Sequence, residues 1–379
     1  MTDPKKNLIC KECPNGCNLS LDWKDEKTVE VKGNKCPKGI VYAARILKSK
    51  KETHIVVKER YPTVSLEVLH EVAGLFGITL KALHYDILIE GSPERSVFRV
   101  VAEDENKNFF LLEQVEHKSL ETKRRIARTL EFLVKEHLSL VRPYLKNRQG
   151  QHILEHKKSF WQVAHFIPGV ALDRTKYIYE KWRGPLLADF LISLYAKSKD
   201  IFPEDRKKDF SLKGYIYKLQ QSIKRHYPPI EAQVDGVISF LEKDFMKVYD
   251  SLPTQFCHGD YHPMNIVWGE DNIRCVIDWE FCGIKPETYD IANLIGCVGV
   301  EHPSSLLGDL VISFLEEMKA PGTISVTSWK YLLEFIIALR FAWLSEWLRR
   351  KDTEMIDLEL TYMNALIDNQ HQLKKAWSL

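Results

Sequence analysis

Residues 256–268 read Phe256-Cys-His258-Gly-Asp260-Tyr-His-Pro-Met-Asn265-Ile-Val-Trp268, and Val276-Ile-Asp278-Trp-Glu280 follows shortly after. The polar positions form the pattern H-G-D-x-x-x-x-N, then an apolar strand, then I-D-W-E. Apolar residues on both sides indicate short buried strands that hold the polar residues on the intervening loops. The pattern therefore places Asp260 on a loop, Asn265 at the end of that loop and Asp278 after a hairpin.

These residue types suit phosphoryl transfer. That reaction needs a carboxylate near the attacking hydroxyl and oxygen ligands for magnesium, which takes one or two protein carboxylates beside substrate phosphates. We expect Asp260 to accept or orient the proton of the substrate hydroxyl. Asn265 and Asp278 would hold the metal, and His258 would brace the loop by hydrogen bonding. The alternative is a surface loop whose polar residues occur together by chance.

The motif resembles that of the aminoglycoside phosphotransferase and choline kinase superfamily, the small-molecule relatives of protein kinases. The downstream stretch Pro286-Glu-Thr-Tyr-Asp290-Ile-Ala is also similar, and the resemblance implies that Asp290 tethers the catalytic loop. Segment order agrees over residues 60–375. The resemblance implies a phosphotransferase that uses ATP and Mg²⁺ and acts on a hydroxyl group of a small molecule. The alternative function is a non-catalytic kinase-like protein that binds a nucleotide or another ligand and is coupled to an N-terminal iron–sulfur or zinc module.

Periodicity along the chain predicts an α+β architecture with a small β-rich lobe followed by a large helical lobe. The resemblance implies that this is the bilobal fold of the protein kinase type. A helix at 65–76 precedes strands at 81–90, 96–102 and 108–115, a helix at 120–137, and strands at 152–155 and 160–166. The rest is mostly helical and is interrupted by strands and loops at 255–284. We therefore expect a cysteine-rich module at 1–50, a small antiparallel lobe at 60–167, and a large helical lobe at 168–379. The predicted helices of the last lobe span 177–199, 212–226, 231–249, 303–318, 328–350 and 354–377.

The resemblance also implies where a nucleotide binds. The turn that begins Gly91-Ser-Pro-Glu-Arg95 would cover the phosphates, with Gly91 and Arg95 as contacts. The backbone near His165 and Ile167, where the two lobes join, would meet the adenine edge.

One position departs from the kinase pattern. Kinases place a lysine on the third strand, where it pairs with the α- and β-phosphates and with a helix glutamate. The matching position here is Glu113. A carboxylate repels phosphates unless a cation intervenes. The candidate cations nearby are Arg95, Arg99, Lys118, Arg124 and Arg125.

The N-terminus holds four cysteines in the pattern Cys10-x-x-Cys13-x-x-x-Cys17 followed by Cys36-Pro-Lys-Gly. Four thiolates bind either zinc or an iron–sulfur cluster. The arrangement resembles the cluster-binding N-terminus of molybdopterin oxidoreductases and an uncharacterised bacterial cysteine-rich domain. Both metals stay open, and an iron–sulfur cluster would imply a redox partner.

Composition excludes several classes of protein. The 379 residues are 45% hydrophobic and 28% charged, which is typical of globular proteins. No apolar run reaches the ~18 residues that a membrane-spanning helix needs, and the N-terminus has no secretory pattern, so we expect no membrane contact and a cytoplasmic location. The net charge of +2 gives no sign of nucleic-acid binding. We expect the remaining cysteines, at 257, 275, 282 and 297, to be small buried hydrophobic residues.

Overall fold

The computed structural model of the chain describes residues 5–11, 18–23, 28–32, 42–43, 54–57, 64–85, 87, 89, 96–201 and 210–379. The chain divides into two units. Unit 1 comprises residues 1–127 and 143–166, and unit 2 comprises residues 128–142 and 167–379.

Unit 1 contains a five-stranded sheet with the strand order β5-β6-β7-β9-β8. All neighbours in this sheet are antiparallel. The antiparallel strands expected between 81 and 166 are therefore confirmed, although the first is shorter than expected. The strands are β5 (Leu80–His84), β6 (Ser96–Asp104), β7 (Phe109–Val115), β8 (Ile153–His156) and β9 (Ser159–His165).

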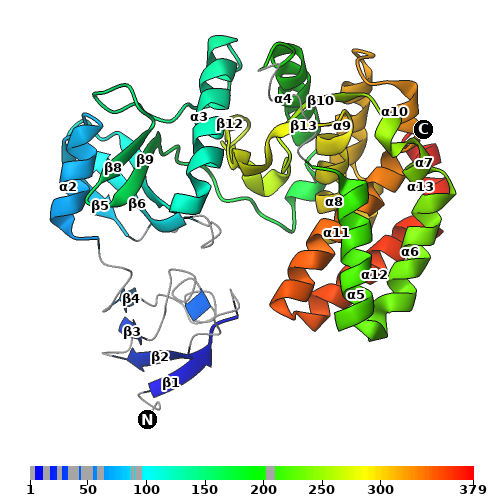
Figure 1. Cartoon of the computed structure of the whole chain (residues 1–379), viewed down its shortest axis with the longest axis horizontal. Coiled ribbons are helices and arrows are strands. Elements are labelled where there is room, and N and C mark those ends of the chain that lie inside the picture. Colours follow the sequence, from blue (N-terminus) through cyan, green and yellow to red (C-terminus); the bar gives the residue numbers. More distant parts are fainter. Residues whose placement is uncertain are drawn as a thin grey trace. The chain divides into compact units, whose positions relative to one another are not determined.

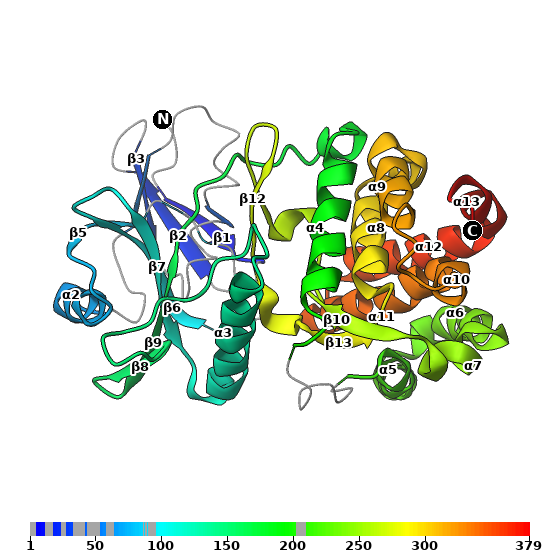
Figure 2. The same ribbon diagram turned by 90° about the horizontal axis from the view of Figure 1, so that it is seen from above.

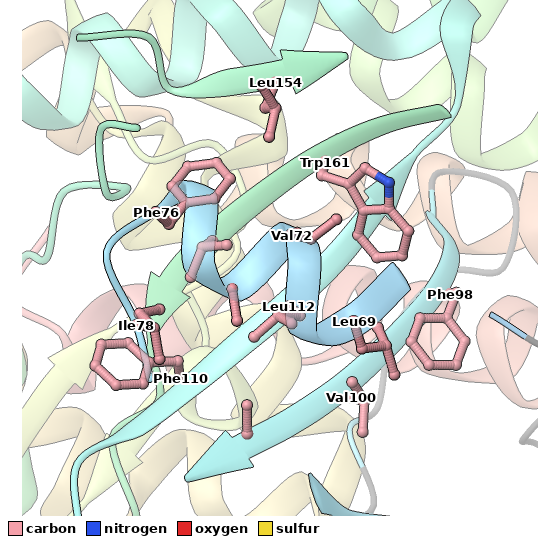
Figure 3. Packing of buried hydrophobic residues seen from close by; sticks show 13 residues of the cluster. Leu69, Val72, Phe76, Ile78, Phe98, Val100, Phe110, Leu112, Leu154 and Trp161 are labelled. Atoms are coloured by element: carbon pink, nitrogen blue, oxygen red, sulfur yellow. The ribbon is translucent and has the colours of Figure 1, made fainter. Parts of the chain in front are cut away.

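Helix α2 (Leu66–Leu75) covers one face of this sheet. Ser65 starts the helix by accepting a hydrogen bond from the backbone N–H of Val68. The apolar side of α2 packs on alternate residues of the strands, as Figure 3 shows for Leu69 and Val72 against Leu112 and Trp161. Strand side chains alternate between the two faces, so Arg99, Glu113 and Gln162, which are direct cross-strand neighbours, share the face opposite α2.

Unit 1 also contains a four-stranded sheet with the order β1-β2-β3-β4. The strands at 18–23 and 28–32 follow the alternation in the sequence. Cys10 is buried in a small apolar cluster with residues of these two strands, among them Leu19 and Val31. The strands are β1 (Lys5–Ile9), β2 (Asn18–Trp23), β3 (Thr28–Lys32) and β4 (His54–Val57).

Unit 2 is mostly helical. Helix α11 contacts α5, α8 and α12, and α4 packs along α9 (Figures 1 and 2). The helices are α3 (Leu120–Lys135, shared with unit 1), α4 (Arg183–Lys197), α5 (Leu212–His226), α6 (Glu231–Lys243), α7 (Phe245–Val248), α8 (Tyr289–Glu301), α9 (Asp309–Lys319), α10 (Val326–Lys330), α11 (Leu332–Arg350), α12 (Thr353–Asp368) and α13 (Gln370–Ala376).

The two charged residues inside the apolar run of α11 are paired with other helices. Glu334 accepts a 2.6 Å hydrogen bond from Lys374, and Arg340 donates a 2.8 Å hydrogen bond from Nε to Glu359. Arg340 and Glu359 are both buried, and such charges are tolerated in a protein interior only when they are paired. In the described part of the chain, no helix is long and apolar enough to cross a bilayer.

Candidate active site

Two short antiparallel pairs in unit 2 position the predicted loop. Strand β10 (Thr254–Cys257) pairs with β13 (Gly283–Pro286), and β11 (Ile266–Trp268) pairs with β12 (Ile273–Val276). The N–H of Ile277 donates to the carbonyl oxygen of Asn265 at 3.0 Å. The hairpin therefore brings Asn265 next to the segment that contains Asp278.

Asp290, at the start of α8, anchors the loop through its carboxylate. Its two carboxylate oxygens accept hydrogen bonds from the backbone N–H groups of His258 at 2.7 Å and Gly259 at 2.8 Å. The expectation that Asp290 tethers the loop is confirmed by these contacts. Burial raises the pKa of Asp290 to about 6, although the two backbone donors and the nearby Lys285 act in the opposite direction.

His258 is fully buried and braces the loop as a neutral ring. Its Nε2 lies 3.0 Å from the carbonyl oxygen of Ile277, and its Nδ1 accepts a hydrogen bond from the N–H of Asp260 at 3.3 Å. Both contacts fit the tautomer that carries its proton on Nε2. Burial lowers the pKa of His258 to about 4, and its ring packs 4.5 Å from that of Trp279. His258 is thus a positioning residue for Asp260.

Asp260 lies at the centre of the loop with its side chain 23% exposed. The amide nitrogen of Asn265 donates to Asp260 Oδ2 at 3.1 Å and to its backbone carbonyl at 2.8 Å. Burial alone would raise the pKa of Asp260, but the hydrogen bond and charge of His262, together with His258 and Asn265, bring it below its usual range. Asp260 is therefore an ionised acceptor that a substrate hydroxyl can reach.

Gly259 is required by the geometry of the loop. Its φ of +84° lies in the left-handed region, and a Cβ at this position would come within 2.1 Å of the carbonyl oxygen of Phe281. Only glycine combines this backbone conformation with such a close approach.

Asn265 and Asp278 fit the coordination of a magnesium ion. The amide nitrogen of Asn265 is bound to Asp260, so the carbonyl oxygen Oδ1 is the atom that Asn265 has for a metal. Asp278 is exposed and has a left-handed backbone at φ 62°, directly before the short helix at 279–281. Within the described ranges, no three His, Cys, Asp or Glu side chains form a metal site, but Mg²⁺ needs only one or two protein carboxylates.

The other predicted nucleotide contacts are distributed as follows. His165 is exposed at the end of β9, with its ring 5.1 Å from that of Phe110. Ile167 is the first residue of unit 2 in this part of the chain. Gly91 and Arg95 lie outside the described residues, and so do Cys13, Cys17 and Cys36 of the predicted metal module. Cys257, Cys275 and Cys282 are buried, as expected, whereas Cys297 is only partly buried.

Glu113 lies between two cations. It accepts hydrogen bonds from Arg99 on β6 and from Lys123 on α3. Arg99 was among the candidates in the sequence, whereas Lys118 pairs with Glu116 instead. The sequence reasoning missed Lys123, although it considered the two following arginines of the same helix.

His262 and Lys285 are two further residues that the sequence reasoning missed. His262 Nε2 lies 3.5 Å from Asp260 Oδ1. Lys285 is buried on β13 with its ammonium 5.0 Å from the ring centre of Tyr289, and its side chain fills the space beside Gly259. The signal for His262 was its position two residues after Asp260. Lys285 had no signal, because only the pairing of β10 with β13 brings it to the loop.

Comparison with known proteins identifies the family of the chain. The model of the phosphotransferase enzyme family matches residues 88–321. No protein of curated function matches the sequence.

Several solved structures share the fold at low sequence identity. One is an aminoglycoside phosphotransferase from Alicyclobacillus acidocaldarius, with 12% identity, a TM-score of 0.58, and coverage of 84% of this chain and 98% of the other. A second is the amicoumacin kinase hAmiN, with 12% identity, a TM-score of 0.56, and coverage of 81% and 94%. A third is a choline kinase from Streptococcus pneumoniae, with 16% identity, a TM-score of 0.53, and coverage of 82% and 98%.

Proposed function

The chain belongs to the phosphotransferase enzyme family and is a phosphotransferase that acts on hydroxyl groups; on that premise we propose that it transfers the γ-phosphoryl group of ATP, with Mg²⁺, to a small molecule. The observation that carries the proposal is the loop between β10 and β11. There Asp260 is ionised and partly exposed, and His258, Asn265 and Asp290 hold it in place.

The residues divide the work as phosphoryl transfer requires. Asp260 would accept the proton of the attacking hydroxyl and orient its oxygen toward the phosphorus. Asn265 Oδ1 and Asp278 would hold Mg²⁺, which would neutralise charge on the phosphates. His258 stays neutral, so it supplies a fixed hydrogen bond and no proton. The amicoumacin kinase structure holds AMP-PNP and Ca²⁺, which supports a nucleoside triphosphate and a divalent ion in this fold.

For the molecule that accepts the phosphoryl group, we propose a chemical class and no single compound. Structural neighbours include kinases for aminoglycosides, choline and macrolides, so a sugar or an amino alcohol with a free hydroxyl is the class that we propose. A thermal-shift screen of the full chain with ATP, Mg²⁺ and such metabolites tests this directly. A ligand at 100 times its Kd stabilises a protein by ~2.7 kcal/mol, which gives a clear shift.

The screen is followed by a transfer assay with the compounds that bind. Formation of ADP together with a phosphorylated acceptor supports the enzyme. Nucleotide binding with no transfer to any compound would favour the non-catalytic binding protein. Identical nucleotide affinity with and without Mg²⁺ would contradict the roles given to Asn265 and Asp278.

We also propose that residues 1–50 bind one metal centre through Cys10, Cys13, Cys17 and Cys36. The burial of Cys10 in a cluster with residues of β2 and β3 supports an inward-facing thiol in this segment. The centre is either an iron–sulfur cluster or a zinc ion, and only an iron–sulfur cluster would imply a redox partner. Elemental analysis of protein purified without oxygen distinguishes them, because an iron–sulfur protein is brown and a zinc protein is colourless.

A further inference from the structure

A three-residue ion cluster lies on the face of the unit 1 sheet opposite α2. Arg99 donates from Nε at 3.0 Å and from Nη2 at 2.7 Å to Glu113 Oε1. Lys123 Nζ lies 3.3 Å from Oε1 and 3.5 Å from Oε2 of the same carboxylate. Two cationic side chains and one carboxylate thus meet on the side of the sheet that α2 does not cover.

The polarity of this cluster is the reverse of the kinase arrangement. In protein kinases a strand lysine contacts the phosphates and a helix glutamate holds the lysine. Here strand β7 carries the carboxylate and helix α3 carries the amine. The side chain of Lys123 is 1% exposed and that of Glu113 is 5% exposed, whereas that of Arg99 is 21% exposed. Arg99 is thus the member that a ligand can reach.

We propose that Arg99 is the cation that binds the phosphates of the nucleotide, and that Glu113 and Lys123 are its positioning pair. Glu113 fixes the guanidinium by accepting hydrogen bonds from two of its nitrogens, and Lys123 neutralises the carboxylate that would otherwise repel phosphate. A planar guanidinium suits this role because it can contact a carboxylate and a phosphate in defined directions. This inference rests on the proposed use of a nucleotide.

Gln162 is a second observation that points to a ligand on this face. It lies directly opposite Glu113 in the pairing of β7 with β9, and its side chain is fully buried. Neither its Nε2 nor its Oε1 has a hydrogen-bond partner among the described residues. Buried amides are nearly always hydrogen-bonded in folded proteins. A polar ligand beside Arg99 would supply the partner.

The test compares nucleotide with nucleoside binding in the full chain. Arg99→Met should weaken ADP binding about 10- to 100-fold by calorimetry, because one charged hydrogen-bonding group is lost. Adenosine, which has no phosphate, should bind as it does to the wild type. The matched control is Lys157→Met, which removes a cation paired with Glu71 on α2 at 2.6 Å. The control should bind ADP normally.

A second, independent test restores the kinase arrangement of charges. The triple variant R99M/E113K/K123E places the amine on the strand and the carboxylate on the helix, so ADP affinity should recover to within about tenfold of the wild type. Circular dichroism checks that each variant folds, and Arg99→Lys replaces Arg99→Met if the latter does not. For Arg99→Lys we expect a smaller loss of ADP affinity.

The outcomes separate this inference from the proposed function. Wild-type protein that binds no nucleotide would contradict the proposed function itself. If the wild type binds ADP and a folded Arg99→Met protein binds it equally well, Arg99 is not the phosphate contact and the cluster is only structural. A folded triple variant that stays as weak as Arg99→Met would likewise overturn the assignment of phosphates to this face.

Discussion

Asp260 differs from its neighbours because it combines an ionised carboxylate with access to solvent. His258, Asn265 and Asp290 lie around it and are nearly or fully buried, so their interactions are internal to the protein. In the proposed function, the loop thus separates the residues that hold its geometry from Asp260, which would meet the substrate hydroxyl. A change at Asp260 should therefore lower the rate of phosphoryl transfer more than it weakens nucleotide binding.

Replacing Asp260 by asparagine tests this separation. Asp260→Asn keeps the size of the side chain but removes the proton acceptor, so turnover should fall about 10²- to 10⁴-fold. The Kd for Mg²⁺-nucleotide should change little, because the proposed metal ligands are other residues. Steady-state kinetics and calorimetry measure the two quantities. Turnover close to that of the wild type would remove Asp260 from the catalytic role.

His258 predicts a specific dependence of stability on pH. The pKa of His258 is about 4 in the folded protein and about 6.5 in an unfolded chain. Between these values the unfolded state binds more protons, so the free energy of unfolding should fall as the pH drops from 6.5 to 4. Asp290, with a folded pKa of about 6, acts in the opposite direction over about pH 4 to 6, because there the folded state binds more protons.

The His258→Gln variant isolates the histidine, since Gln can still donate to the carbonyl of Ile277 and does not titrate. Asp290 is present in both proteins, so its contribution largely cancels in the comparison. The melting temperature of the wild type should decline more steeply than that of the variant as the pH falls from 7 to 5. Parallel profiles for the two proteins would show that His258 is not a buried neutral ring.

Much of the site was predictable at the residue scale, and the exceptions have physical causes. The polar spacing of Asp260, Asn265 and Asp278 is local, so the sequence shows it. The partner of Glu113 depends on the helical phase of α3, and an error of one residue separates Lys123 from Arg124. Lys285 reaches the loop only through strand pairing, which no local pattern records.

At the scale of elements, helix α8 shows where periodicity fails. The predicted helices left residues 285–302 unassigned, although α8 spans Tyr289–Glu301 and most of its residues are buried. A helix that is buried on every side has no polar face, so it lacks the amphipathic pattern by which a helix is found. By contrast, α5 has a clear polar face, and its bounds at 212 and 226 agree with the prediction.

Two glycines allow the loop and a helix to be compared directly. Gly259→Ala should destabilise the protein by at least ~1–3 kcal/mol and greatly reduce turnover, because of the left-handed φ and the contact with Phe281. Gly236→Ala is the matched control, since Gly236 lies within α6 and a Cβ there meets no atom within 4 Å. This control should stabilise the protein by ~0.5–1 kcal/mol. Chemical denaturation measures both, and equal effects would contradict the loop geometry.

At the scale of the whole molecule, the division into two units places the candidate chemistry and the Arg99 cluster on different parts of the chain. Asp260, Asn265 and Asp278 belong to unit 2, whereas Arg99, Glu113 and Lys123 belong to unit 1. Each unit has its own buried core, so a substitution in one set of residues can be made without changing the core of the other unit. The predicted order of strands and helices agrees with the antiparallel five-stranded sheet of unit 1 and with the helical character of unit 2. Strands β1 and β4 were not predicted, because two- to four-residue apolar runs such as Ile55-Val-Val57 carry little signal.

The cysteine module allows the independence of the parts to be tested. A module of ~50 residues has little core of its own, and its buried cluster has seven side chains among the described residues, so the proposed metal should supply much of its stability. Cys36→Ser should therefore abolish metal binding and unfold the module. Helix-rich unit 2, which is built around the fully buried face of α11, should melt at an unchanged temperature. Differential scanning calorimetry and elemental analysis report these results, with Cys275→Ser as a control that removes a buried thiol far along the sequence from the module.

If phosphoryl transfer survives in Cys36→Ser, the module is an appendage to the enzyme. If transfer is lost while unit 2 stays folded, the metal centre regulates catalysis. Metal content equal to that of the wild type would refute the four-thiolate site.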